Sequence, residues 1–579
     1  MCLSLQVLPV SDISGVTGDD DGTSDDDDDD DVLYFLAEPD GACQVSDDDT
    51  VSYDFSDTPN DSDISDRPNG RDNQWTRNKL KCTKTDFDII QVVPSSSFLP
   101  DDGPGEFFGR FFDESVFQWL ASQTNLYAAQ KSIRYWSDTT VSEMKAFVGI
   151  LIAMGLHVVP SIDLYWSTDP LFRVRPISQV MPVKRFKKLL QALHVNDNSR
   201  TPKRGTASYD KVYKVRPLLN KLNEEFAGQC VSTSSQSIDE AMILFKGRST
   251  LKQYMPMKPT KRGYKAWVRA DAATGYMFQC EIYTGKTTDD SSETDLGGRV
   301  VTSLTRSLTQ CNLQDIHIAF DNFFASFDLM QKLYNDGIYA TSTVRPMRKN
   351  LPDIAREKLK LQRGEFEWRT RSNTGYVQWK DSKNVHVLST AFAPQETVTV
   401  QRKQKDGSTI AVTCPRSVAQ YTQRMGGVDR FDQKRECYTV SRKSRRWWLR
   451  IFYFLLDASI VNAYILFMSV HVDSNFNQLR FRTLLFRELV QNYSSRQRRA
   501  SRDVNFLPPT VHKAVRKPLG VPDVLRLNTV GVHLPEMLAS HRRCRFCSSR
   551  KNNKRSRYQC KTCLVPLCIS PCFAKFHGQ

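Results

Sequence analysis

The spacing of apolar side chains predicts a change from helices to strands and back to helices along the chain. Between residues 107 and 222, apolar residues recur three and four positions apart, as in the runs 116–120 and 144–152, which predicts amphipathic helices. In the run 184–193, basic residues alternate with apolar ones, so this helix is expected to carry a basic face. Residues 107–222 are therefore predicted to be helical.

After Ser232 the pattern takes the period of strands, with apolar runs at 242–245, 266–270, 277–283 and 316–320. Thr274 and Gly275 stand between two of these runs and predict a hairpin turn. Helical spacing returns at 326–335, strand-like runs follow at 384–388 and 398–401, and a helical block extends from Tyr421 to about Val472. We expect an α/β domain flanked by helices.

The longest apolar run, 447–472, is nearly long enough to span a membrane. It contains Arg450, Asp457 and Asn462, and a charged side chain at the centre of a bilayer is costly. We therefore expect a helix buried in a globular core. The apolar stretch 1–10 has no basic flank and is followed by an acidic tract, so neither a signal peptide nor a membrane partner is expected.

Charge is divided unevenly along the 579 residues. The net charge is +15, but the segment before Arg67 holds 21 acidic residues and no Lys or Arg, so the remainder carries +36. An excess of this size favours a polyanionic partner, of which nucleic acid is the commonest and a phospholipid surface the alternative. Residues 1–84, with a carboxylate run at 25–31, are predicted to be disordered, either as a solvating tail or as a DNA mimic or partner tail.

The 14 cysteines fall into two groups. Eight are scattered between Cys2 and Cys437, which is typical of a reducing compartment. Six crowd together near the C-terminus and, with one histidine, supply seven Zn²⁺ ligands at short spacings: Cys544, Cys547, Cys560, Cys563, Cys568, Cys572 and His577. Seven ligands complete one tetrahedral site and leave a second without its fourth, for which His541, water and no ligand all stay open.

The spacing does not give the pairing of these ligands. A cross-brace of RING or PHD type is one arrangement, and with it come a ubiquitin-ligase and a histone-reader function. However, the loop 550–557 is basic, and residues 480–579 hold 21 Lys and Arg against four acids. DNA is therefore the favoured partner of this module.

Carboxylates stand out in the middle of the chain. Asp239 enters the first predicted strand, Asp321 ends the apolar strand 316–320, and Asp429 and Asp432 fall three apart near a helix start. Two-metal phosphoryl transfer needs carboxylates from separate elements that converge on one point. The order strand, strand end, helix matches a nuclease core of RNase H-like fold.

Longer motifs around these residues resemble the piggyBac transposase family. The resemblance extends from about Phe107 to Gln579 and leaves only the acidic N-terminus without motif support. It rests on 237–240 (SIDE), 245–248 (FKGR), Lys258-Pro259 with Lys261, Gly263 and Lys265, 320–322 (FDN) and 426–429 (GGVD) with Asp432-Gln433, and on Tyr165-Trp166, Arg185-Phe186, 193–195 (LHV) with Asn198, 214–218 (KVRPL) and Gly275-Tyr276.

The resemblance implies that Asp239, Asp321 and Asp429 are the catalytic, Mg²⁺-binding residues, with Asp432 as a fourth acid. Trp447 matches a tryptophan that matters downstream of the Gly-Gly-Val-Asp motif; a core aromatic and a direct role at the DNA both stay open. Members cut double-stranded DNA at transposon ends through hairpin intermediates and integrate at TTAA. A homodimer, a nuclear location and a cysteine-rich domain that binds transposon-end DNA are implied as well.

The resemblance also implies a segmented architecture, in which a helical domain is built from parts before and after an RNase H-like domain with an insertion. The expected boundaries are a tail at 1–84, the helical dimerisation and DNA-binding domain at 85–231 and 441–493, the catalytic domain at 232–346 and 417–440, the insertion at 347–416, a basic linker at 494–540 and the zinc-binding domain at 541–579.

A basic strip near the first catalytic strand is suited to phosphates, unless it is a solvated surface: Lys246, Arg248, Lys258, Lys261, Arg262 and Lys265. Two functions of different class stay open. One is an active transposase, and the other is a domesticated DNA- or chromatin-binding protein that keeps the fold and no longer cuts. The retained aspartates favour the first.

Overall fold

A computed structural model gives the structure of the chain. It describes residues 74–80, 92–99, 101–256, 258–285, 296–311, 315–404, 406–471, 476–491, 493–494, 533–549 and 553–577. Two compact units form, one within residues 1–497 and one within 498–579. Most of the predicted acidic tail and most of the predicted linker lie outside the described residues.

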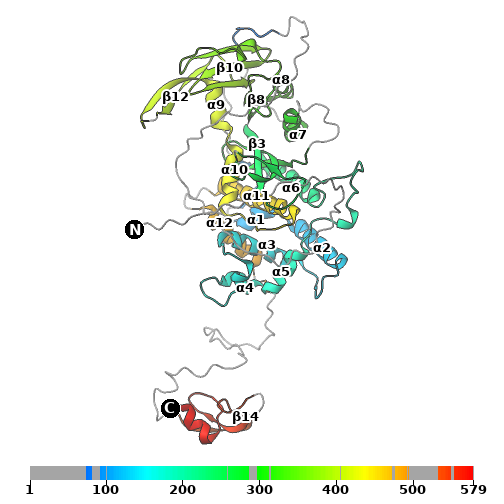
Figure 1. Cartoon of the computed structure of the whole chain (residues 1–579), viewed down its shortest axis with the longest axis vertical. Coiled ribbons are helices and arrows are strands. Elements are labelled where there is room, and N and C mark those ends of the chain that lie inside the picture. The colour runs from blue at the N-terminus through cyan, green and yellow to red at the C-terminus, as the bar shows by residue number, and fades with distance from the viewer. Residues whose placement is uncertain are drawn as a thin grey trace, which may run out of the picture. The chain divides into compact units, whose positions relative to one another are not determined.

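The centre of the first unit is a sheet around strand β3 (Ser235–Leu244), drawn in green in Figure 1. On one side β3 pairs antiparallel with β5 (Arg262–Asp271), which pairs antiparallel with β6 (Met277–Ile282). On the other side β3 pairs parallel with β7 (Ile316–Phe320), and β7 parallel with β8 (Ile338–Thr343). Three antiparallel strands followed by two parallel ones form the RNase H-like arrangement, so the predicted fold class is confirmed.

The strands of 347–416 partly extend this same sheet. β8 leaves an edge that accepts β11 (Asn384–Ser389), and β10 (Thr374–Lys380) and β9 (Phe366–Arg371) follow in antiparallel order. β12 (Thr397–Lys403) and β13 (Thr409–Pro415) form a separate hairpin that packs on β10. The strand-like runs predicted at 384–388 and 398–401 are confirmed as β11 and β12.

Helices from both ends of the first unit share one hydrophobic core. Residues of α1 (Pro104–Gly109) and α3 (Val141–Leu156) contact α12 (Gln478–Val490), which lies far away in sequence. The other helices of this block are α2 (Glu114–Gln130), α4 (Arg175–Val180), α5 (Val183–Ala192), α6 (Arg216–Gly228) and α11 (Trp447–Val470). The opposite face of the sheet is covered by α7 (Leu296–Gln310) and α8 (Phe327–Asn335).

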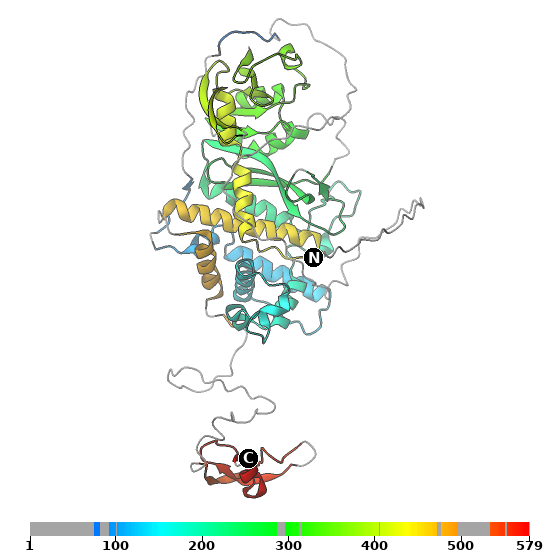
Figure 2. The same cartoon turned by 60° about the vertical axis from the view of Figure 1, so that its left-hand side comes forward.

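The long apolar helix α11 lies in the centre of the helical core, as expected. Of its most apolar 18-residue stretch, 89% is buried inside the protein. Figure 2 shows it as the long yellow-orange helix between the sheet and the blue and cyan helices. Its polar residues have partners. The side chain of Asn462 donates to the carbonyl oxygen of Met277 at 2.8 Å and accepts from its N–H at 2.9 Å, which joins α11 to β6.

Three boundaries differ from the prediction. β3 begins at Ser235, seven residues before the predicted run at 242, because Ser235–Ser237 are polar and yet buried between β5 and β7. The predicted helical block from Tyr421 begins earlier and is divided into α9 (Arg416–Arg424), α10 (Gly427–Cys437) and α11. The prediction that residues up to 84 lack structure is wrong for 74–80, which pair with β9 at Thr76.

Candidate active site and zinc centres

Two of the predicted aspartates stand side by side on neighbouring parallel strands. The register pairs Ile238 of β3 with Phe320 of β7, and Asp239 and Asp321 each follow these residues directly. Parallel neighbours lie about 4.8 Å apart and side chains alternate between faces, so both carboxylates lie on the same side of the sheet. Asp239 thus stands in the middle of β3 rather than at its entry, where the sequence had suggested it.

The third aspartate comes from α10, which approaches the sheet closely because its first residue has no side chain. A Cβ on Gly427 would lie 2.5 Å from the hydroxyl of Ser237 and 2.6 Å from the carbonyl oxygen of Asp271. Gly275, in the predicted hairpin turn and at a φ of +76°, would likewise meet the backbone nitrogen of Phe431 at 2.7 Å. The helix therefore starts against β3, and Asp429 lies in its first turn.

Burial and the nearby charge of Asp239 raise the pKa values of Asp321 and Asp429. Desolvation and the charge on Asp239 raise the pKa of Asp321 to about 6, and the same two causes raise the pKa of Asp429. The carboxylate of Asp321 is oriented by the N–H of Phe323, which donates to it at 2.7 Å. Among the described residues, no three carboxylates bring oxygens within 4.8 Å of one another, so the cluster is a loose one.

Two lysines of the predicted basic strip turn into this cluster. The ammonium of Lys258 lies 3.4 Å from Asp239 Oδ2 and donates to the carbonyl oxygen of Glu240 at 3.2 Å. Lys265 Nζ lies 3.8 Å from Glu240 Oε2 and 3.8 Å from the centre of the Trp267 ring. Desolvation lowers the pKa of Lys258, but the charges of Asp239 and Glu240 outweigh this effect and raise the pKa above its ordinary value. Desolvation lowers that of Lys265.

Glu240 is an acid of the cluster that the sequence analysis did not single out. Its side chain is 11% exposed, and desolvation together with the charge on Asp239 raises its pKa to about 7. The sequence did offer one signal for Glu240. It stands beside Asp239 in a predicted strand, and a buried acid is rare unless it has a charged partner. Glu240 and the two lysines form a charged support around Asp239.

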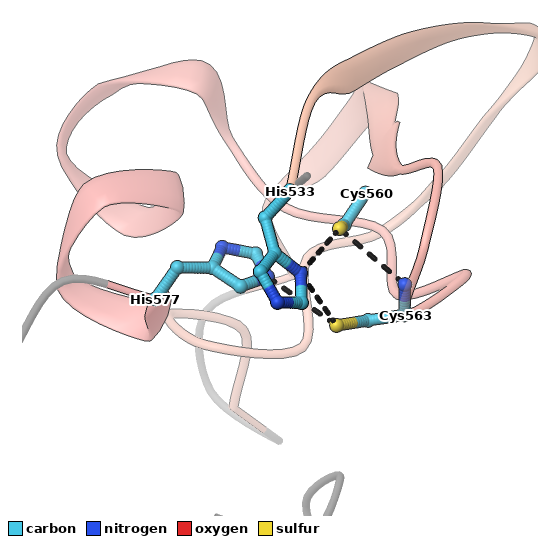
Figure 3. Close-up of side chains that lie close together, drawn as sticks. All are labelled: His533, Cys560, Cys563 and His577. Carbon is cyan, nitrogen blue, oxygen red and sulfur yellow. Dashed lines mark hydrogen bonds between the residues drawn. The ribbon is translucent and has the colours of Figure 1, made fainter. Parts of the chain in front are cut away.

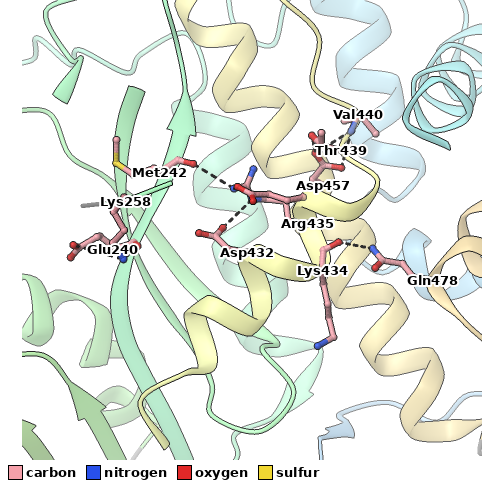
Figure 4. Close-up of polar contacts among 11 residues, drawn as sticks. Glu240, Met242, Lys258, Asp432, Lys434, Arg435, Thr439, Val440, Asp457 and Gln478 are labelled. Atoms are coloured by element: carbon pink, nitrogen blue, oxygen red, sulfur yellow. Dashed lines mark hydrogen bonds and ion pairs between the residues drawn. The ribbon is translucent and has the colours of Figure 1, made fainter. Parts of the chain in front are cut away.

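Asp432 lies one helical turn after Asp429, but its carboxylate has another partner. Its Oδ1 accepts from Arg435 Nε at 3.0 Å, and buried Arg435 also donates to the carbonyl oxygen of Met242 in β3 at 3.4 Å (Figure 4). This link fastens α10 to β3. Asp432 thus contributes to the helix–strand contact, whereas Asp429 is the α10 acid on which, after desolvation, the charge of Asp239 acts to raise the pKa.

The remaining predicted DNA contacts lie on the surface of the first unit. Lys246, Arg248, Lys261 and Arg262 are exposed, and the guanidinium of Arg262 lies over the ring of Tyr254 at 5.3 Å. Trp447, the first residue of α11, is half-buried and packs against the helical core, whereas the adjacent Trp448 is fully buried.

The C-terminal unit brings its cysteines and histidines into two groups of four. One group contains Cys544, Cys547, Cys568 and Cys572, and within each group all ligand atoms lie within 4.8 Å of one another. The second group uses Cys560 and Cys563, which stand between the two cysteine pairs of the first group. The two sites are therefore interleaved along the chain, as in a cross-brace.

The second group is completed by His533 and His577 (Figure 3). His533 precedes strand β14 (Pro535–Arg543), whose pairing with β15 (Arg555–Cys560) brings it to Cys560. The sequence analysis missed it because it lies 27 residues before Cys560. His541, one of the open choices, is exposed and belongs to neither group. The expected boundary at 541 is thus too late.

The donor atoms fit two tetrahedral Zn²⁺ ions. Zn–S bonds of about 2.3 Å and Zn–N bonds of about 2.0 Å place two sulfurs about 3.8 Å apart and a sulfur and a nitrogen about 3.5 Å apart. Cys547 and Cys568 have their sulfurs 3.8 Å apart, and Cys563 Sγ lies 3.2 Å from His533 Nδ1 and 3.5 Å from His577 Nε2. The Phe573 carbonyl accepts from His577 Nδ1 at 3.0 Å, so Nε2 is the nitrogen that faces the sulfur of Cys563 and would hold the ion.

Known proteins resemble both units. The Transposase IS4 family model matches residues 103–464, and the DDE_Tnp_1-like zinc finger model matches residues 530–578. Human PiggyBac transposable element-derived protein 3 is 30% identical over 479 residues, which cover 79% of this chain and 78% of that protein. Human PiggyBac transposable element-derived protein 2 is 29% identical over 385 residues, covering 66% of this chain and 64% of that protein.

A solved structure shares the fold. The cryo-EM structure of the piggyBac transposase synaptic complex with hairpin DNA matches with a TM-score of 0.63 and 22% identity, covering 83% of this chain and 98% of that one. The transposase family model over the first unit and the DDE_Tnp_1-like zinc finger model over the second place the chain in the class of DDE transposases. Within that class, the chain belongs to the piggyBac transposase family.

Proposed function

We propose that this chain is a metal-dependent transposase that cleaves DNA at transposon ends and transfers the strands into TTAA target sites. Its partner is double-stranded DNA, it acts in the nucleus, and it works as a homodimer. Asp239, Asp321 and Asp429 are the catalytic residues. The observation that carries the proposal is the alignment of Asp239 with Asp321 on parallel strands, together with the close packing on β3 of a helix whose first turn contains Asp429.

The carboxylates have the chemistry that Mg²⁺ or Mn²⁺ prefers, and their raised pKa values suit a site that receives cations. Two such ions, when bound, activate the attacking oxygen and stabilise the leaving one. Lys258 holds Asp239, and the N–H of Phe323 orients Asp321. Asp432 has a smaller share, since Arg435 already neutralises its carboxylate.

Exposed Lys246, Arg248, Lys261 and Arg262 are proposed to hold the DNA backbone, because Lys and Arg contacts to phosphate supply most of the sequence-independent affinity. Lys258 and Lys265 act differently from the prediction, as supports of the acidic cluster. Trp447 has a half-buried ring, so a contact with DNA through its exposed part is part of the proposal.

The test is cleavage of a labelled cognate end by the wild type and by Asp239→Asn, Asp321→Asn and Asp429→Asn. We expect Mg²⁺-dependent nicking that each substitution lowers by several orders of magnitude, because uncatalysed phosphodiester cleavage is very slow. DNA affinity without metal should persist or rise slightly. The control is Asp336→Asn, an exposed aspartate at the end of α8, which should cut like the wild type.

The second candidate function is a domesticated DNA- or chromatin-binding protein, and the names of the human relatives, transposable element-derived proteins, favour its consideration. The same assay separates the two. Undiminished cleavage in all three Asn variants would refute the site. Absence of wild-type cleavage on inverted repeats bounded by TTAA, together with metal-independent DNA binding, would support the binder.

A further inference from the structure

A short N-terminal segment, 74–80, lies along the outer edge of the catalytic sheet. The N–H of Thr76 donates to the carbonyl oxygen of Thr370 in β9, and the N–H of Thr370 donates back to Thr76, each at 2.8 Å. The Thr370 hydroxyl donates to the carbonyl oxygen of Asn78 at 2.7 Å. The segment therefore pairs with β9 as an added strand, and β9 is the last strand of the sheet.

One aromatic side chain anchors this segment. The ring of Trp75 lies 5.4 Å from Phe327 and 6.3 Å from Tyr376, edge-on to both. Its indole Nε1 donates to the carbonyl oxygen of Asn350 at 2.9 Å. The next residue but one, Arg77, pairs with Glu367 of β9 at 3.2 Å. A partly apolar ring with one directed hydrogen bond, next to a strand pairing, is how an extended peptide is recognised at a sheet edge.

The contact with Asn350 leads to the active site. Asn350 ends a short loop after β8, and Arg348 in this loop donates to the carbonyl oxygen of Phe323 at 2.7 Å. Arg345 Nε donates to the side chain of Asn322 at 3.0 Å. The loop thus holds the turn of 321–324, whose N–H groups at Phe323 and Phe324 donate to Asp321.

We propose that the segment 74–80 is a docking strand, which binds to the edge of β9 and to the aromatic pair Phe327 and Tyr376. Its docking positions the turn that contains Asp321. The occupant is the chain's own segment. An unpaired sheet edge exposes hydrogen-bonding groups, and this segment pairs with those of Thr370 in β9. When Trp75 undocks, the loop at Asn350 loses the hydrogen bond from the indole, and the turn at Asp321 becomes more mobile. Trp75 is a positioning residue, because it acts through Asn350 and Arg348.

Hydrogen exchange on the full-length protein tests the docking. In the wild type, fragments 74–80 and 366–371 should be protected, and Trp75→Ala should raise their exchange rates roughly tenfold or more, because local opening exposes these amides. Trp75→Phe keeps a ring without the donor and should fall between the two. The control is Tyr135→Ala, which removes an aromatic ring that is 94% exposed. Equal, fast exchange of 74–80 in the wild type and in Trp75→Ala would overturn the proposal.

The positioning is read in the same experiment at fragment 321–324. Trp75→Ala should speed its exchange while exchange in α11 stays unchanged, which excludes general unfolding. Unchanged exchange at 321–324 after loss of docking would overturn the positioning. A synthetic peptide of residues 72–81 added to Trp75→Ala should restore protection, whereas the same peptide with Ala for its Trp should not.

A consequence for catalysis rests on the proposed function. Trp75→Ala should raise the Mg²⁺ concentration for half-maximal nicking several-fold and leave metal-free DNA affinity unchanged. An unchanged Mg²⁺ requirement despite a loosened turn would contradict this consequence. A wild type that never nicks would contradict the proposed function instead, and the exchange measurements would still decide the docking and the positioning.

Discussion

Asp321 holds its charge at a cost when no cation neutralises it. Its pKa of about 6 in the folded chain lies above the ordinary value because of desolvation and the charge on Asp239. The protonated carboxyl of Asp321 contributes stability to the folded state. This contribution is fully present below the ordinary Asp pKa of about 4, and it is lost as the pH rises through the folded-state pKa of about 6. At neutral pH this acid therefore destabilises the metal-free fold, as residues at functional sites often do.

Asp321→Asn should raise the thermal midpoint of the metal-free catalytic unit by roughly 1–2 °C at about pH 7.5 and by nothing at about pH 4. The wild type should gain stability from Mn²⁺ at the higher pH and lose this gain below about pH 6, where protons occupy the acid. The variant should gain less at every pH. Thermal unfolding with and without Mn²⁺ measures both effects, and a less stable variant at neutral pH would contradict the origin of the shift.

His533 decides the second zinc site. Because it completes a four-ligand group, His533→Ala should leave that site with three protein ligands and weaken its hold on the metal. After treatment with a mild chelator, wild-type protein should retain two zinc ions per chain and the variant one, as measured by elemental analysis. His541→Ala is the matched control and should retain two. Loss of zinc in the control instead of in His533→Ala would reverse the assignment.

Helix α10 is placed by contacts that only a glycine permits. Gly427 lies where a Cβ would meet the hydroxyl of Ser237 and the backbone of Asp271, and Arg435 fastens the next turns of the helix to β3. The position of Asp429 therefore depends on a glycine two residues earlier. A helix shifted by a fraction of an ångström would move the third acid away from the first two.

Gly427→Ala should shift the start of α10 and lower nicking by about 100-fold, because misplacement of a reacting group by about 1 Å has effects of this size. Circular dichroism and metal-free DNA affinity should stay as in the wild type. The control is Gly228→Ala at the end of α6, where a Cβ would meet nothing within 4 Å. Full activity of Gly427→Ala would show that Asp429 tolerates a displaced helix.

Helices and strands with a clear hydrophobic periodicity were predictable from the sequence. Segments that are buried only because they pair with other strands were not. The apolar runs of β5, β6 and β7 and the turn at Gly275 were found because alternation and turn chemistry are local signals. The start of β3 was missed because Ser235–Ser237 are buried by neighbouring strands. Glu240 was missed although it stands beside Asp239, because only the fold brings Lys258 and Lys265 to it. His533 was missed because it lies 27 residues before Cys560. The segment 74–80 was missed because Trp75 and Leu80 are its only apolar residues.

At the scale of the whole molecule, the chain divides into two compact units, one within residues 1–497 and one within 498–579. In the first unit, helices from before and after the sheet pack together in one large hydrophobic core, so apolar burial and not zinc holds this unit together. The second buries few large apolar side chains among its described residues, and its cysteines and histidines make up much of its interior. A module of this kind draws most of its folding free energy from zinc.

Removal of zinc should therefore separate the two units. A strong chelator, or Cys560→Ser, should unfold the C-terminal module while the thermal transition of the catalytic unit stays in place. Because the module is rich in Lys and Arg, affinity for transposon-end DNA should fall, whereas nonspecific DNA affinity, carried by the basic surface of the first unit, should fall less. Calorimetry and DNA binding with and without chelator measure these effects. A purified protein without zinc and with unchanged affinity for the ends would show that the module neither holds metal nor recognises DNA.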